Sequence, residues 1–235
     1  MTFASERLGR RRFVCLGLLT VSLTLLASAA TARKPLAAPA TSQAVPAEPR
    51  PSADASRVFA WIVKSGDNLE LPFVIVDKVG ARVFAFDRHG VPKGSAPVLL
   101  GLGRGDTSPP GIGQRRLRDI AQAEQITPAG RFIAGLGNDL GEADILWVDY
   151  DSALSLHRVI TGNPKDQRLQ RLATASIADN RISYGCINAP VAFFEGVILP
   201  LFNKTNGVVY ILPEVKPLTE VFGLLPDPQI ARLGD

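Results

Sequence analysis

Short apolar runs separated by turns dominate the pattern along most of the chain. Residues 72–76 and 82–86 are β-branched and aromatic runs joined by a four-residue connection at 78–81, which predicts a hairpin. Further strands are expected at residues 98–102, 131–134, 145–148, 155–159 and 207–213. The pattern predicts a mainly β (α+β) fold, a compact β-sandwich or barrel-like domain with a few peripheral helices.

Three segments have a helical pattern instead. A helix is expected from Ala55 to Lys64, capped by residues 52–54 and ended by Gly66. Asn163 and Pro164 predict the start of a short helix that runs to about residue 173. A third helix should begin near residues 188–190 and end near 203. Its expected core-facing residues are Val191, Phe194, Ile198 and Leu201.

The first thirty residues are typical of an export signal. Four arginines precede an apolar run at residues 13–30, and small residues at 30–32 predict cleavage after Ala32. The run is short for a membrane span of about 20 apolar residues, so an uncleaved anchor is the less favoured interpretation. Residues 10–14 also resemble a twin-arginine signal, which leaves the export route open.

These features divide the chain into four parts. Residues 1–32 form the signal peptide, and residues 33–56, rich in alanine and proline, are expected to be a disordered linker. One catalytic domain is expected over residues 57–213, with its core at 70–213, followed by a C-terminal extension at 214–235. The expected location is the periplasm or cell envelope, with membrane contact only through the signal before cleavage.

Most of the net positive charge belongs to the signal. Removing the signal leaves 22 basic and 21 acidic residues, so the net charge falls from +4 to +1. A nearly neutral domain has no charge reason to bind nucleic acid, and we expect none as a partner.

Cysteine is scarce, because Cys15 lies in the signal and Cys186 is the only other thiol. A single thiol in an oxidising compartment is either buried and inert or kept for its reactivity. Cys186 lies just before the third expected helix, whose positive end would favour a thiolate. Gly185 permits close backbone approach, so nearby N–H groups could point at an oxyanion.

A cysteine nucleophile needs a base, and the chain has two histidines. His89 lies in a polar turn at residues 87–90, which favours an exposed histidine. His157 lies in an apolar strand pattern, where it is either a hydrogen-bonded core residue or a base that faces a cleft.

These segments together resemble the YkuD family of L,D-transpeptidases. The family's cysteine motif is matched by Ser183, Gly185, Cys186, Ile187 and Asn188, and its upstream histidine by His157. Residues 126–132 resemble the family's Thr-Pro-x-Gly-x-Phe segment, and the resemblance covers about residues 70–213. Tyr184 stands where the family usually has a second histidine. The interval of 26 positions from His157 to Ser183 is longer than the family's usual spacer.

The resemblance implies an exported L,D-transpeptidase that crosslinks peptidoglycan or attaches protein to it. Cys186 would form a thioester, with His157 as its base. The residues implied to frame the oxyanion site are Ser183, Tyr184 and Gly185. Asn188 would support the loop and contact substrate, and Arg181 would meet a substrate carboxylate unless it is a solvated surface charge.

The implied partners are peptidoglycan stem peptides and, where a protein is attached, an acceptor protein amine. No cofactor is expected, and two histidines with one cysteine supply no zinc pattern.

Other functions stay open at this point. A cysteine hydrolase would let water resolve the thioester, and an inactive wall-binding module would explain Tyr184. Acidic residues at 144, 149 and 151 suggest paired carboxylates for glycoside cleavage, but strand ends with a solvated face are the favoured interpretation. The glycine-rich stretch at 101–113, with two prolines, indicates an exposed loop, and it lacks the Gly-Lys-Ser/Thr of a phosphate loop.

Overall fold

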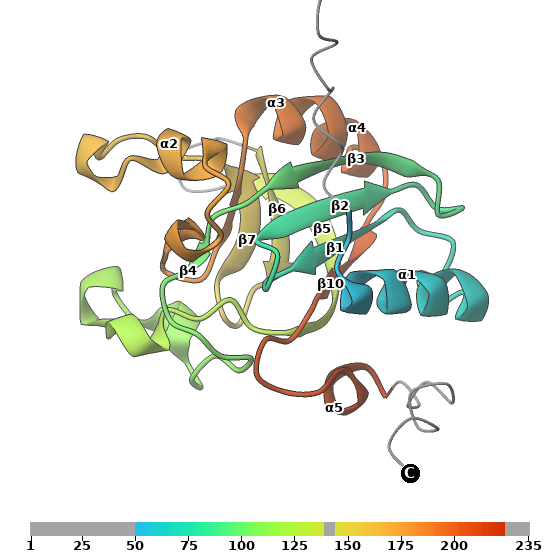
Figure 1. Ribbon diagram of the computed structural model, residues 1–235, viewed down its shortest axis with the longest axis horizontal. Helices are drawn as coiled ribbons and strands as arrows, with labels where there is room; N and C mark the ends of the chain where they lie inside the picture. Colours follow the sequence, from blue (N-terminus) through green and yellow to red (C-terminus); the bar gives the residue numbers. More distant parts are fainter. Residues whose placement is uncertain (1–49, 139–143, 224–235) are drawn as a thin grey trace, which may run out of the picture. The chain divides into compact units, whose positions relative to one another are not determined.

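A computed structural model describes residues 50–138 and 144–223 of the chain. Its centre is an eight-stranded, nearly closed sheet in the order β3-β2-β1-β10-β5-β6-β7-β9, beside a two-stranded sheet of β4 and β8 (Figure 1). The strands of the large sheet are β1 Phe73–Asp77, β2 Arg82–Phe86, β3 Pro92–Pro97, β5 Gly130–Asn138, β6 Asp144–Asp149, β7 Leu154–Arg158, β9 Ile187–Ala189 and β10 Gly207–Ile211. The small sheet pairs β4 Leu100–Gly101 with β8 Arg181–Ser183.

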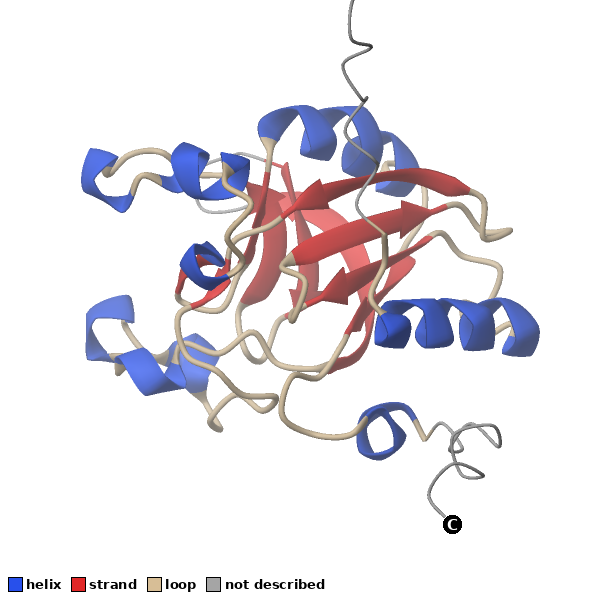
Figure 2. Cartoon of the chain, viewed as in Figure 1, coloured by secondary structure: helices blue, strands red, loops and turns tan. Residues whose placement is uncertain are grey.

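Short helices lie around the sheet, as Figure 2 shows. They are α1 Ala53–Ser65, α2 Arg168–Ala173, α3 Val191–Phe193, α4 Leu199–Phe202 and α5 Leu218–Phe222. Five 3-10 turns lie at Ile112–Gln114, Leu117–Asp119, Gln122–Glu124, Pro164–Asp166 and Ala178–Asn180. The expectation of a mainly β, mixed α+β fold with few helices is therefore confirmed at this level.

The predicted hairpin forms, with β1 antiparallel to β2 through Phe73–Phe86 and Asp77–Arg82 pairs. β1 also pairs in parallel with β10, so it is an interior strand and all five of its residues are buried. Because side chains alternate between the two faces of a strand, β1 serves two cores. Val74 and Val76 pack into the larger core, whereas Phe73 and Ile75 face a second core covered by α1.

Helix α1 forms where the sequence predicts it. The Ser52 hydroxyl accepts a hydrogen bond from the N–H of Ala55 at 3.0 Å, and Gly66 ends the helix in the left-handed conformation. Val58 and Ile62 lie on its buried face. The helix begins at Ala53, so residues 53–56, expected to belong to the linker, are helical.

Strand β3 was not predicted. Its sequence contains two prolines and a glycine, and its first three residues are exposed, so no apolar alternation marks it. It forms because it is an edge strand, where proline does not interrupt a second ladder. The strand expected at 98–102 is reduced to β4, which pairs with β8.

The third expected helix begins later than the sequence predicts. Residues Ile187–Ala189 are strand β9, which pairs in parallel with β7, and helical structure starts at Val191. The helix then runs to Phe202 through a π-helical turn at Phe194–Ile198. Phe194 and Ile198 are buried as expected, but Val191 is exposed and Leu201 only partly buried, while Phe193 and Phe202 fill the core.

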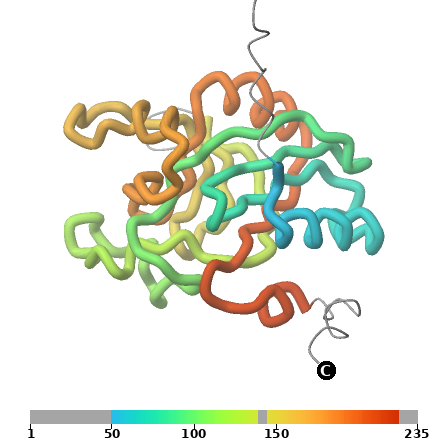
Figure 3. Tube along the Cα trace, in the orientation of Figure 1, coloured from blue at the N-terminus to red at the C-terminus, as the bar shows by residue number. Residues whose placement is uncertain are grey.

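The second expected helix is split. Gln167 adopts a left-handed backbone (φ 50°), which separates a 3-10 turn at 164–166 from α2. In Figure 3 this segment and the 3-10 turns at residues 112–124 project from the same side of the molecule. Both segments contribute to the cleft described below.

The signal peptide, most of the linker and residues 224–235 of the C-terminal extension lie outside the described residues. Within residues 50–138 and 144–223, no helix is both long and apolar enough to span a membrane.

Candidate active site

The pairing of β7 with β9 brings the two predicted catalytic residues together. Its parallel register sets Leu156 opposite Ile187 and His157 opposite Asn188. One step earlier in the same register, Ser155 lies beside Cys186, and its hydroxyl is 3.5 Å from the sulfur. Alternation along β7 places Ser155 on the same face as His157. Two polar side chains of β7 therefore lie on the face beside the Cys186 segment.

The imidazole of His157 is oriented by the backbone. Its Nδ1 lies 2.7 Å from the carbonyl oxygen of Arg158, which can only accept, so Nδ1 carries the hydrogen. Nε2 is then free to accept a proton from the thiol. Burial by itself lowers the pKa of His157, but its hydrogen bond and charge attraction to Cys186 outweigh burial and raise this pKa.

Cys186 is a partly exposed free thiol. Burial by itself raises the pKa of this thiol, but hydrogen bonds from His157 and Ser155 outweigh burial and lower it. The two opposite shifts have one cause, because each charged partner stabilises the other. Both shifts favour the thiolate–imidazolium form of the pair over the neutral form.

The helix expected to assist the thiolate is not in place. Because β9 intervenes, the first helical residue is Val191, and Cys186 lies before a strand. The prediction that a helix N-terminus stabilises this thiolate is therefore wrong.

The loop before Cys186 is held by Ser183. Its buried hydroxyl donates to the carbonyl oxygen of Cys186 at 2.6 Å and accepts from the N–H of Gly185 at 3.1 Å. Ser183 and the Gly185 N–H are thus used within the loop, which corrects the expectation that they frame an oxyanion site. Among the described residues, the N–H groups of Tyr184 and Cys186 have no acceptor, so they remain available for that role.

Gly185 meets the expectation of close backbone approach. It has φ 134°, and a Cβ there would lie 2.9 Å from the carbonyl oxygen of Ile126. The Thr127 hydroxyl donates to the Gly185 carbonyl oxygen at 2.7 Å. Segment 126–132 therefore holds the loop before Cys186 in place, through contacts of Ile126 and Thr127 with Gly185.

Arg181 does not face a substrate. It is 9% exposed, and its Nη2 lies 2.6 Å from Glu214 Oε2. Both sequence interpretations, a substrate contact and a solvated surface charge, are wrong. Glu214, expected to begin a peripheral extension, is buried with its side chain 2% exposed.

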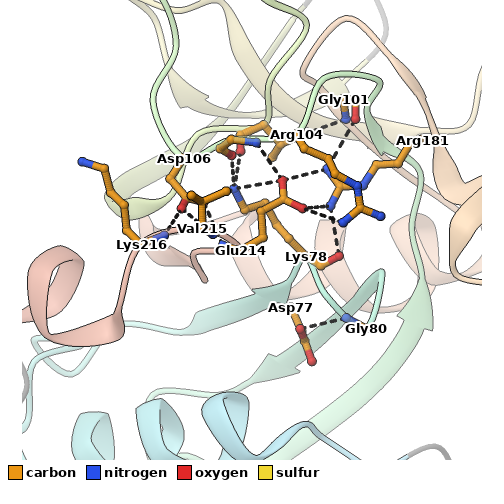
Figure 4. Close-up of polar contacts among 12 residues, drawn as sticks. Asp77, Lys78, Gly80, Gly101, Arg104, Asp106, Arg181, Glu214, Val215 and Lys216 are labelled. Atoms are coloured by element: carbon orange, nitrogen blue, oxygen red, sulfur yellow. Dashed lines mark hydrogen bonds and ion pairs between the residues drawn. The ribbon is translucent and has the colours of Figure 1, made fainter. Parts of the chain in front are cut away.

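This ion pair is part of a buried network of charges (Figure 4). Lys78 Nζ donates to Asp106 Oδ1 and to the Gly105 carbonyl oxygen, both at 2.6 Å, and to the Thr127 carbonyl oxygen at 2.9 Å. Burial raises the pKa of Asp106, but hydrogen bonds from Lys78 and the N–H groups of residues 214–216 outweigh it and lower the pKa to about 2. Through Thr127 this network supports the cysteine loop.

Asn188 is buried and contacts both residues of the predicted catalytic pair. Its Nδ2 donates to the Cys186 carbonyl oxygen at 3.2 Å and lies 3.5 Å from His157 Nε2. Its Oδ1 accepts from Arg168 Nη1 at 2.8 Å, which fixes the orientation of the amide. The expected support of the loop is confirmed, whereas substrate contact by Asn188 stays a prediction. Arg168 was missed, since only the long interval between His157 and Ser183 marks its segment.

Replacing Arg168 by methionine is expected to lower the free energy of unfolding by about 2 kcal/mol, because the buried Asn188 oxygen loses a charged donor. Urea denaturation measures this change. Arg116→Met is the control, since Arg116 is 70% exposed in its pair with Asp119 and should contribute less than about 1 kcal/mol. Equal losses in the two variants would contradict the proposed support of Asn188.

Cys186 and His157 open onto a cleft of about 960 Å³. Its apolar lining is Leu117, Ile145, Trp147, Val159 and Ile160, and its charged lining is Asp144, Arg158 and Arg168. Tyr184 is 43% exposed and lines both this cleft and a small hollow that Cys186 also lines. The cleft has room for a peptide with the sulfur in its wall.

The remaining candidates do not form sites. His89 is exposed in its turn, as expected, and its Nε2 accepts from Arg88 Nε. Asp144, Asp149 and Asp151 are exposed or half-buried at the ends of β6. In the two described ranges no cluster of three histidine, cysteine or acidic residues could hold a metal ion. The chain matches no protein-family model and no curated protein.

Proposed function

We propose that this chain is an exported peptidoglycan L,D-transpeptidase that works through a cysteine thioester. The observation that carries the proposal is the placement of Cys186 and His157 on one open cleft, with Ser155 Oγ 3.5 Å from the sulfur and the imidazole oriented by the Arg158 carbonyl. A thiol with this environment is a nucleophile, and the cleft admits an extended peptide.

The first half of the reaction makes the thioester. His157 Nε2 takes the thiol proton, and the sulfur attacks the carbonyl carbon of the L-centre in a donor stem peptide. The N–H groups of Tyr184 and Cys186 stabilise the oxyanion. The C–N bond breaks, the released D-residue takes the proton from His157, and the acyl group stays on the sulfur.

The second half transfers the acyl group. An acceptor amine enters the cleft and His157 removes its proton as the nitrogen attacks the thioester carbonyl. The C–S bond breaks, a new amide forms, and the sulfur recovers the proton from His157. No further group is required for either half.

Peptidoglycan as the substrate is supported by the resemblance to the YkuD family. The matched residues Ser183, Gly185 and Asn188 all contact the cysteine segment in the fold. The compact β domain with peripheral helices fits the same family, and the signal pattern at residues 1–32 supports export. Tyr184 would replace the usual second histidine at the rim of the cleft.

Mass spectrometry of purified muropeptides tests the proposal. The full chain is incubated with tetrapeptide muropeptides, with and without a free D-amino acid as the acceptor amine. We expect exchange of the terminal D-residue only when the amine is present, together with an acyl adduct on Cys186. Cys186→Ala should give neither product nor adduct.

The other outcomes would overturn the proposal in distinguishable ways. Release of the terminal D-residue at the same rate without amine would indicate a hydrolase. Muropeptide binding with neither exchange nor adduct would indicate a wall-binding module.

A further inference from the structure

Ser155 is a buried hydroxyl that the reaction above does not use. It is 4% exposed, and its Oγ lies 3.5 Å from the sulfur of Cys186. Among the described residues its side chain makes no other hydrogen bond. A buried hydroxyl without a partner is unfavourable, so the sulfur is the group that satisfies Ser155.

The end of the β7–β9 ladder explains why Ser155 faces the sulfur. β9 begins at Ile187, opposite Leu156, so the ladder stops before it reaches Ser155 and Cys186. Beyond the end of the ladder, the Ser155 hydroxyl donates to the sulfur at 3.5 Å and helps to lower the pKa of Cys186.

We propose that Ser155 is a further catalytic residue, whose hydroxyl donates to the thiolate of Cys186 and holds it toward the cleft. This role rests on the proposed function only in requiring that Cys186 be the nucleophile. The Ser155 hydroxyl would stabilise the thiolate in place of the helix N-terminus that the sequence predicted.

Loss of the proton from Cys186 shows what the Ser155 hydroxyl contributes. As a thiol, Cys186 can donate its S–H to the carbonyl oxygen of Ala153, which lies 3.5 Å from the sulfur. When the S–H bond breaks and the proton passes to His157 Nε2, that carbonyl oxygen faces an anion and repels it. The hydroxyl of Ser155 then offsets the repulsion, since hydrogen bonds to charged acceptors are stronger than those to neutral ones.

The described residues place several charged or titratable side chains along the cleft. Besides Cys186, these are Asp144, His157, Arg158, Arg168 and Tyr184. Among the described residues that line the small hollow, only Tyr184 and Cys186 titrate. A change in the titration of Cys186 on removal of the Ser155 hydroxyl is therefore readily assigned.

The pH dependence of Cys186 alkylation by iodoacetamide tests this role. The thiolate attacks the carbon, a C–S bond forms and iodide leaves, so the rate follows the thiolate fraction and needs no substrate. For Ser155→Ala we expect a rate about tenfold lower than wild type near about pH 6, because the thiolate loses one charge-assisted hydrogen bond. Near about pH 10, where the thiol of either protein is ionised, the rates should agree within about twofold.

Two further variants separate this role from a structural one. Ser155→Thr retains the hydroxyl and should restore at least half of the wild-type rate near about pH 6. Ser152 lines the small hollow, and its hydroxyl donates to Asp149 rather than to the sulfur. Ser152→Ala should therefore leave the pH profile of alkylation unchanged.

The outcomes distinguish this inference from the proposed function. If the pH profile of Cys186 alkylation in wild type is typical of an ordinary thiol, both the role of Ser155 and the proposed function are overturned. A thiolate present near neutral pH in wild type and equally in Ser155→Ala would overturn the role of Ser155 alone. Alkylation of Ser155→Thr as slow as that of Ser155→Ala would also overturn the role of Ser155, since the threonine variant keeps the hydroxyl.

Discussion

Replacing His157 by glutamine is expected to slow formation of the acyl adduct on Cys186 by about 1,000-fold near neutral pH. Glutamine can approximate the shape of the ring but cannot take the thiol proton. The thiol also loses the hydrogen bond that most strongly lowers its pKa. Both effects reduce the concentration of the thiolate. The substitution also removes the acid that protonates the leaving amine.

Rapid mixing with a muropeptide, followed by mass spectrometry of the intact protein, measures the adduct. The deficit should shrink as pH rises, because the unassisted thiol of the variant then ionises by itself. His89→Gln is the matched control, since His89 is exposed in a turn and should be as active as wild type. Undiminished adduct formation by His157→Gln would exclude this histidine as the base.

The elements that the sequence predicted well are those with local causes. α1 has its cap at Ser52 and its stop at Gly66 within its own segment, and the β1–β2 hairpin joins neighbouring runs. Cys186 and His157 could also be proposed as a pair from the sequence, because the chain offers so few residues that can do this chemistry.

The sequence predictions fail where a contact with a residue far along the chain determines the structure. Residues 188–190 read as a helix start, but the free edge of β7 pairs with residues 187–189 as β9. Arg181 read as a substrate contact, but its partner Glu214 lies 33 residues further along the chain. Ser155 could have been found from the sequence, since a serine two residues before His157 in a strand shares its face. Arg168 could not, because nothing local indicates that α2 reaches Asn188.

Replacing Lys78 by methionine is expected to lower the free energy of unfolding by about 3–5 kcal/mol, which is the usual cost of removing one partner from a buried ion pair. The Lys78 ammonium is fully buried and donates to three oxygens. Without it, Asp106 and Glu214 keep their negative charges in the interior with Arg181 as the remaining buried cation. The carbonyl oxygens of Gly105 and Thr127 also lose their donor.

Urea denaturation measures this loss, and Lys93→Met is the matched control. Lys93 pairs with Asp87 at 2.8 Å with 41% of its side chain exposed, so the same substitution should cost less than about 1 kcal/mol. Similar small losses at both sites would show that the buried network is not a support of the fold. A large loss at Lys78 alone would mean that the buried network of Lys78, Asp106 and Glu214 supports the fold. Because Lys78 also donates to Thr127, and Thr127 to the Gly185 carbonyl oxygen, the loop before Cys186 is connected to this network. The position of the proposed nucleophile would then depend on charges outside the cleft that contains it.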